Sequence, residues 1–131
     1  MSESNLRQAL DGHLYTMADA PAIAWEGKNY TPSNSIYLQS FLLPAETISV
    51  GVEAGGSDVL AGLYQVTVNV PKNSDKNVWL TETAKVKARF ARGTILNVGG
   101  TRIVISKTWS STANISETYY GVPISIRYRA I

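Results

Sequence analysis

The stretch LAGLYQVTVNVP, Leu60 to Pro71, decides the fold. From residue 64 to residue 70 every second residue is apolar, and the residues between are polar. Successive side chains of a β-strand point to opposite faces, so this period of two predicts a strand with one buried face and one wet face. The apolar set is Tyr64, Val66, Val68 and Val70, and the polar set is Gln65, Thr67 and Asn69.

A helix is predicted on each side of this strand. Ser4 is suited to cap a helix that begins near residue 5, and apolar residues then recur at helical spacing to about residue 18, before Pro21. A second run of helical spacing begins at Ser74 and continues to Phe90. Gly93 follows it at a position where glycine commonly ends a helix.

Shorter extended segments complete the predicted fold. Strands are expected over 22–26, 36–43, 94–98, 101–109 and 119–129, with Gly99-Gly100 as a two-residue hairpin turn. Residues 45–58 contain three glycines and are predicted to form a long loop. The expected class is therefore α+β: two helices packed on a mostly antiparallel sheet, in the order α-β-β-β-α-β-β-β, within one domain over 1–131.

The segment YLQSFLLPAE, Tyr37 to Glu46, is apolar at positions on both faces of its predicted strand. A strand with one solvent-exposed face would alternate instead. Two explanations stay open: a central strand covered on both sides by its own chain, or a strand with one face buried by a neighbouring subunit. In either case the strand leads into the loop predicted over 45–58.

Charge is divided unevenly along the chain. The net charge is +2, but residues 1–58 hold two basic and seven acidic side chains, whereas residues 59–131 hold ten basic and three acidic ones. Such a division is typical of a protein with a basic face for phosphate or of one guided electrostatically to a partner. Simple solvation of both halves accounts for it equally well.

Motifs that support catalysis are absent from the sequence. There is no cysteine, and His13 is the only histidine, so thiolate sites and paired-histidine zinc sites are excluded. Neither AGGSD nor GTILNVGG has the lysine or the strand-turn-helix setting of a phosphate-binding loop. We therefore predict no catalytic, cofactor-binding or metal-binding residues and no enzyme. Neither a signal peptide nor a membrane-spanning run is evident, which favours a soluble protein folded in a reducing compartment.

The chain as a whole resembles the tail terminator, or tail completion, proteins of long-tailed bacteriophages. The resemblance rests on the successive strings IAWEGKNYTP, YLQSFLLPAE, GLYQVTVNVP, FARGTILNV and GVPISIRYRAI. It implies a small α+β subunit that forms a ring, usually a hexamer, at the end of the tail tube. Its implied partners are further copies of itself, the tail tube protein and the head–neck connector protein, with DNA only passing through the lumen. It implies no cofactor, no membrane partner, and assembly in the host cytoplasm into the virion tail.

Within this resemblance, candidate contact residues follow from charge and aromatic content. Ring subunits associate through two different faces, and an acidic and a basic half suit that arrangement. The expected acidic side contains Glu46, Glu53 and Asp58, and the expected basic side contains Lys85, Arg89 and Arg92. Trp25 and Trp109 are candidate interface anchors, with a core role equally open. Arg102, Arg127 and Arg129 are candidates to line the lumen.

Three alternatives remain open from sequence. A head–tail connector or head-completion subunit would share the small size, the ring and the absence of catalytic motifs. A small hydrolase would need convergent carboxylates, whereas Asp11 and Asp19 belong to no recognisable motif. A nucleic-acid-binding module would use the basic cluster at 85–92, but that cluster lacks a neighbouring aromatic stacking platform.

Overall fold

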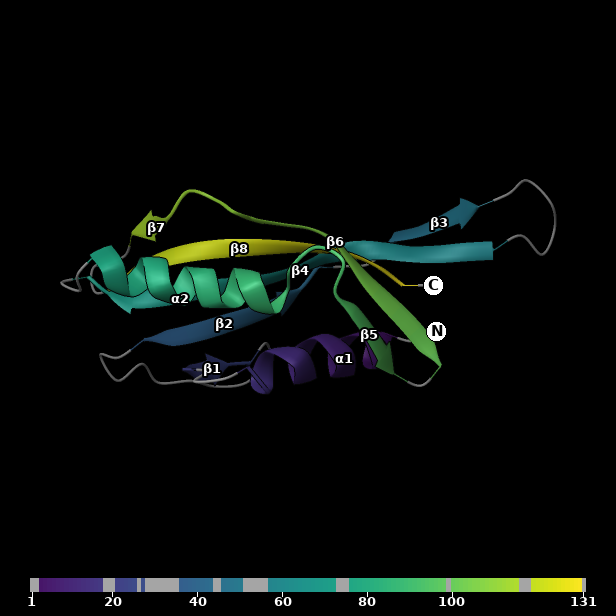
Figure 1. Ribbon diagram of the computed structural model, residues 1–131, viewed down its shortest axis with the longest axis horizontal. Helices are drawn as coiled ribbons and strands as arrows, with labels where there is room; N and C mark the ends of the chain where they lie inside the picture. The colour runs from purple at the N-terminus through teal and green to yellow at the C-terminus, as the bar shows by residue number, and fades with distance from the viewer. Residues whose placement is uncertain are drawn as a thin grey trace.

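A computed structural model of the chain describes residues 3–17, 21–25, 27, 36–43, 46–50, 57–72, 76–98, 100–115 and 119–130. Figure 1 shows the arrangement of the helices and strands in these residues. In chain order they are α1 (Glu3–Tyr15), β1 (Ala22–Ala24), β2 (Tyr37–Leu42), β3 (Glu46–Val50), β4 (Ser57–Pro71), α2 (Lys76–Arg89), β5 (Ile95–Val98), β6 (Thr101–Ser110), β7 (Asn114–Ile115) and β8 (Tyr119–Ala130).

The strands form one sheet with β4 and β8 at its centre. Its order is β1-β2-β4-β8-β6-β5, with β3 added to β4 and β7 added to β8. β1 runs parallel to β2, and the other paired strands are antiparallel. The predicted α+β class and mostly antiparallel sheet are therefore confirmed. The predicted element order is confirmed only in part, because the described residues contain two further strands, β3 and β7.

The prediction of a long loop over 45–58 is wrong for residues 46–50 and 57–58, which belong to strands. Residues 46–50 form β3, which pairs with the first residues of β4, so that Ile48 lies opposite Val59 and Val50 opposite Ser57. The β-branched residues of this segment favour a strand, and pairing with β4 satisfies its backbone hydrogen bonds. β7 is a further strand in the segment between the strands predicted over 101–109 and 119–129.

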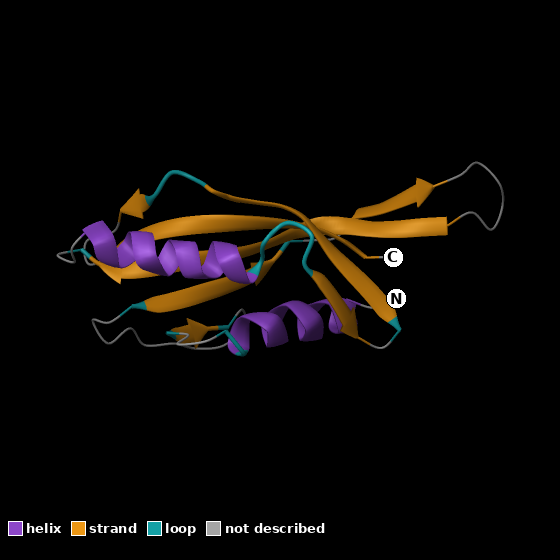
Figure 2. Ribbon diagram, in the orientation of Figure 1, coloured by secondary structure: helices purple, strands orange, loops and turns teal. Residues whose placement is uncertain are grey.

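Both helices cover the same face of the sheet, and the core lies between them and that face (Figure 2). Each set of core residues comes from one register of its element, as the period-two and helical spacings predict. α1 contributes Leu6, Leu10, Leu14, and α2 with the residue after it contributes Val86 and Phe90. The sheet contributes Leu38, Leu42, Tyr64, Val66, Val68, Val70, Ile103, Ile105, Ile124, Ile126, Tyr128 and Ala130.

Gly93 and Gly100 lie where the sequence predicts the end of a helix and a hairpin turn, respectively. Gly93 has a φ of 91° shortly after α2, a backbone conformation that side chains with a Cβ rarely adopt. Its N–H donates to the carbonyl of Ile105, which fastens the end of the helix to β6. Gly100 has a φ of 79°, and Val98 pairs with Thr101 across the predicted two-residue turn.

β2 lies between the edge strand β1 and the central strand β4 and is paired with both. Leu38 and Leu42 are buried under the helices, and the ring of Tyr37 packs against Tyr119 with 5.1 Å between centroids. Phe41, in contrast, is 38% exposed on the other side of the strand. The isolated subunit thus covers one face of this apolar strand fully and the other only in part.

Candidate functional surface

The side of the sheet opposite the helices carries the polar register of each central strand. In β8, Ile124, Ile126 and Tyr128 are buried under the helices, whereas Arg127 and Arg129 are exposed. The register pairs Arg127 with Leu63 and Arg129 with Ala61 on β4. Successive side chains of a strand point to opposite faces, so these two arginines lie on the side of the sheet that the helices do not cover.

A β-bulge in β6 adds further residues to this side. Ile105 pairs with Tyr128, and after an irregularity in the register Lys107 pairs with Arg127. One extra residue in a strand reverses the face to which all later residues point. Lys107 and Trp109 therefore share the helix-free side with Arg127, whereas uninterrupted alternation would have turned them toward the helices.

Trp109 lies between two cations on this side. Its ring centroid is 5.1 Å from Lys107 Nζ and 5.8 Å from Arg127 Cζ. Lys107 and Arg127 are directly opposite each other on neighbouring strands, a pairing that repels. The negative face of the indole ring offsets part of this repulsion, because cations are attracted to it.

We call this surface the basic face and define it by Arg102, Lys107, Trp109, Arg127 and Arg129. The four cationic side chains are exposed, and Trp109 is half-buried. Four like charges close together on one side raise a positive potential that attracts an anionic partner.

Arg89, predicted as a contact for a neighbouring subunit, joins the two helices of its own chain. Its Nε donates to the carbonyl of His13 at 2.8 Å, and its Nη2 donates to Thr16 Oγ1 at 2.7 Å. In return, His13 Nε2 lies 2.6 Å from the carbonyl of Arg89. These bonds hold the C-terminal ends of α1 and α2 together, so the guanidinium is engaged within the subunit.

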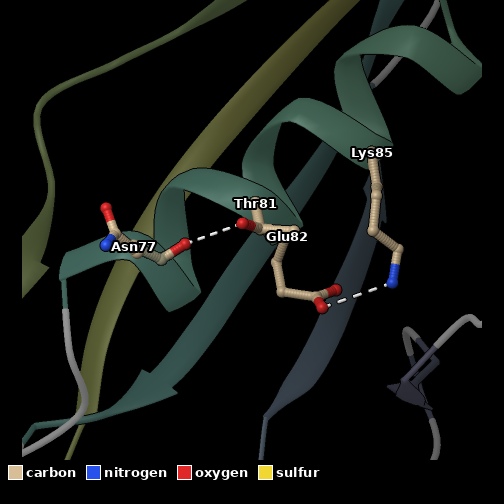
Figure 3. A network of polar contacts seen from close by, with 4 residues as sticks. All are labelled: Asn77, Thr81, Glu82 and Lys85. Atoms are coloured by element: carbon tan, nitrogen blue, oxygen red, sulfur yellow. Dashed lines mark hydrogen bonds and ion pairs between the residues drawn. The ribbon is translucent and has the colours of Figure 1, made fainter.

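The other two predicted cations of this region differ in their surroundings. Lys85 is half-buried and forms an ion pair with Glu82 one turn earlier, with 3.2 Å between Nζ and Oε1 (Figure 3). Figure 3 also shows Thr81 donating to the carbonyl of Asn77, a bond of 2.8 Å within the same helix. Arg92 is exposed after the end of α2. Of the three, Arg92 is thus the most accessible to a partner.

The predicted aromatic anchors occupy different places. Trp109 belongs to the basic face. Trp25 follows β1, is half-buried against the core, and has its ring centroid 6.4 Å from that of Tyr15. Because Tyr15 is 70% exposed, this aromatic pair lies at the surface beside α1. The structure does not bring Trp25 and Trp109 into one cluster.

The predicted acidic residues lie along the strand pair formed by β3 and the beginning of β4. Glu46 begins β3 opposite Ala61, and Asp58 lies in β4 opposite Ser49. Glu53 falls outside the described residues. Figure 1 shows this strand pair extending away from both helices, at the end of the sheet where β8 also ends.

The junction of the two helices gives a pH-dependent prediction. Burial lowers the pKa of His13 below its ordinary value of 6.5, and the charge of Arg89 lowers it further, against the opposing effect of the backbone hydrogen bond. The unfolded chain therefore binds a proton on His13 more readily, and stability is lost as the pH falls below 6.5 toward the folded pKa. We expect the urea midpoint to fall between pH 7.5 and pH 5.5 by more in the wild type than in His13→Gln. An equal fall in both proteins would contradict this account.

Across the described ranges, no helix is both long enough and apolar enough to cross a membrane. In the same residues, no three or more histidine, aspartate or glutamate side chains gather as a metal site would require.

Comparison with known proteins gives a family and a fold. The sequence model of a family described as "Phage tail terminator protein" matches residues 5–128. One solved structure, known only by a serial designation, has a TM-score of 0.80 and 26% identity, and the match covers 100% of this chain and 96% of that one. No curated protein matches the chain.

Proposed function

The chain belongs to the phage tail terminator protein family, whose members are structural proteins of the phage tail, and we propose that it caps the tail tube as a ring of six copies. One side of the ring binds the last ring of tube protein and ends polymerisation of the tube. The other side forms the tail part of the head–tail joint and receives the connector protein of the neck. The proposed action makes and breaks no covalent bond.

The observation that carries this proposal is the extent of the family match. It runs from residue 5 to residue 128, from within α1 to within β8. It thus spans the sheet and both helices and is not confined to one shared motif. We accordingly treat residues 1–131 as one tail-terminator-like domain, assembled in the host cytoplasm and incorporated into the virion tail.

Ring closure requires that one surface of a subunit contact a different surface of the next. The uneven division of charge along the chain supports this kind of contact, because acidic and basic segments attract one another between subunits. Each exposed ion pair contributes less than about 1 kcal/mol, so charge sets orientation and association rate while apolar contacts supply affinity. Arg92, Trp25 and the partly exposed Phe41 are available for such contacts.

Deleting the gene from the phage or prophage that carries it tests the proposed function. Electron microscopy of the lysate is expected to reveal overlong tails or tails without heads, since tube growth would continue without a cap. Expression of the wild-type protein from a plasmid should restore tails of normal length. Virions of normal length and infectivity without the gene would refute the proposal.

Co-purification separates the proposed role from that of a head–tail connector. A tagged terminator is expected to be recovered with tail tubes made in the absence of heads. Recovery with DNA-filled capsids, and not with tubes, would instead assign the subunit to the head side of the joint.

A further inference from the structure

We infer that the basic face binds the phosphate backbone of DNA, independently of base sequence, with Lys107 and Arg127 as its central contacts. The inference goes beyond the proposed ring, because it concerns a surface that one free subunit already presents. Three features of the face support it: a like-charged pair, the alignment of this pair with further cations, and a tryptophan that holds the pair in place.

The pairing of Lys107 with Arg127 is unfavourable for the isolated subunit. The two residues are directly opposite each other on antiparallel strands, and like charges at such positions repel. The β-bulge after Ile105 creates this pairing, and bulges commonly re-aim a side chain beside a functional site. An anion between the two side chains would replace the repulsion with charge-assisted hydrogen bonds, which phosphate accepts from both lysine and arginine.

The remaining cations extend this pair into a line along the helix-free side. Arg129 is two residues beyond Arg127 on β8, and Val104 lies opposite it on β6. Arg102 is a further two residues along β6, so it shares the side of Val104. Two residues of a strand span about 7 Å, so the line from Lys107 to Arg102 is about 13 Å long. A linear polyphosphate can follow such a line, whereas a protein partner would have to present its carboxylates in the same arrangement.

One carboxylate position borders this line. The register continues from Arg129 through Ala61 of β4 to Glu46 of β3, so Glu46 has a position on the same side of the sheet. Neighbouring strands are about 4.8 Å apart, which sets this position about 10 Å from Arg129 along the sheet. Arg127 and Lys107 are farther from it, because they pair one step further along β8. The main phosphate contacts are therefore assigned to these two cations, and Arg129 contributes less.

Trp109 holds the like-charged pair in place. Its ring centroid is 5.1 Å from Lys107 Nζ and 5.8 Å from Arg127 Cζ, so both cations are attracted to one ring. Because the cations already occupy the space beside the ring, Trp109 is a positioning residue and not a stacking platform for bases. The group that the site recognises is therefore phosphate, which carries no sequence information.

Fluorescence anisotropy with a labelled DNA duplex tests the inference in the full-length protein. Between about 50 and 200 mM NaCl, the logarithm of the association constant should fall linearly with the logarithm of the salt concentration. The expected slope is about −2 to −4, which corresponds to about two to four phosphate contacts for each subunit. Duplexes rich in A·T and duplexes rich in G·C should bind with equal affinity.

Single substitutions locate the contacts. Lys107→Gln and Arg127→Gln should each weaken DNA binding about 3- to 10-fold at about 100 mM salt and reduce the magnitude of the slope by about 1. The matched control is Lys87→Gln, which removes the same charge from an exposed position of α2, a helix on the other side of the sheet. This control should keep the affinity and the slope of the wild type. Circular dichroism verifies that each variant is folded.

A further variant, Trp109→Leu, separates positioning from charge. It removes no cation, so the salt slope should stay as in the wild type, while the affinity falls about 2- to 5-fold because the two cations lose their shared ring. A slope reduced as far as in Lys107→Gln would contradict the positioning role.

The inference fails if the wild type does not bind the duplex at protein concentrations up to about 100 μM. It also fails if Lys107→Gln and Arg127→Gln bind DNA no more weakly than Lys87→Gln does. Unchanged DNA binding by Arg127→Gln, together with lost co-purification with tail tubes, would assign the basic face to an acidic protein surface instead.

The deletion experiment gives a separate result. Overlong tails in the deletion strain, with no DNA binding by the purified protein, would reject only this inference. DNA binding by the purified protein, with normal virions in the deletion strain, would reject only the proposed terminator function.

Discussion

Replacing Phe90 with alanine is expected to lower the free energy of unfolding by about 3–5 kcal/mol. The side chain is fully buried, and its ring lies 5.0 Å from that of His13 and 5.8 Å from that of Tyr64 between centroids. It thus fills the space where α1, the end of α2 and β4 meet. Truncation opens a cavity that three rigid elements cannot close, so the lost burial and the cavity both add to the cost. Urea unfolding followed by circular dichroism measures the change.

Two further variants make the test specific. Leu80 is on α2 but 44% exposed, so Leu80→Ala should change the free energy of unfolding by no more than about 0.5 kcal/mol. Phe90→Leu keeps most of the volume and should cost about 1.5 kcal/mol or less. If Phe90→Ala costs no more than Leu80→Ala, then Phe90 does not fill the junction as described.

The sequence predicts the central strands and both helices of this fold, because local residue spacing determines each of them. The apolar alternation from Tyr64 to Val70 and the similar alternation around Ile126 identify the two strands that lie side by side at the centre of the sheet. Helical spacing likewise locates both helices, and Gly93 locates the end of the second. Spacing along the chain reports the buried face of each element directly, since that face is set by its own backbone period.

β3 was not predicted from the sequence, because a strand at this position depends on its pairing with β4. The glycines at 51, 55 and 56 favour a long loop over 45–58, although Thr47, Ile48 and Val50 before them are β-branched. β-branched residues on both sides of a glycine-containing segment, here Ile48 and Val50 before it and Val59 after it, indicate a hairpin. What spacing alone does not provide is the register that pairs Glu46 with Ala61.

The basic face could be predicted only in part. The alternation of β8 predicts that Arg127 and Arg129 are on a wet face, but it does not reveal which elements border that face. Lys107 joins them only because the register shifts after Ile105, and a bulge leaves no reliable mark in the sequence. Uninterrupted alternation from Ile105 would have assigned Lys107 to the core side, so its partnership with Trp109 required the structure.

The predicted interface cations illustrate a different limit. Lys85, Arg89 and Arg92 are close in sequence and appear alike as a basic cluster. In the structure, Arg89 is bonded to α1, whose residues are more than seventy positions earlier in the chain. A cation bonded to a distant segment of its own chain is less available to a partner, and the composition of the local sequence does not reveal such bonds. Whether these residues also contact a neighbouring subunit stays a prediction.

Tyr64→Phe is expected to lower the free energy of unfolding by about 1.5–3 kcal/mol. The hydroxyl of Tyr64 donates to Asp11 Oδ1 at 2.5 Å, and Ser40 also hydrogen-bonds to it. The side chain is 1% exposed, and burial raises the pKa of Tyr64 above its ordinary value, so the hydroxyl keeps its proton and remains a donor. Phenylalanine preserves the ring but leaves a half-buried carboxylate on α1 without this donor, and α1 is then held to the sheet less tightly.

A double-mutant cycle distinguishes loss of this hydrogen bond from loss of packing. Asp11→Ala alone leaves the buried Tyr64 hydroxyl without its acidic partner, while the pair of substitutions removes both ends of the bond. If the bond contributes as described, the two single costs will exceed the double cost by about 0.5–3 kcal/mol. Tyr15→Phe removes the same hydroxyl group from a residue that is 70% exposed and should change the free energy of unfolding by at most about 0.5 kcal/mol. Strict additivity of Tyr64→Phe and Asp11→Ala would mean that this hydrogen bond contributes nothing measurable to the free energy of unfolding.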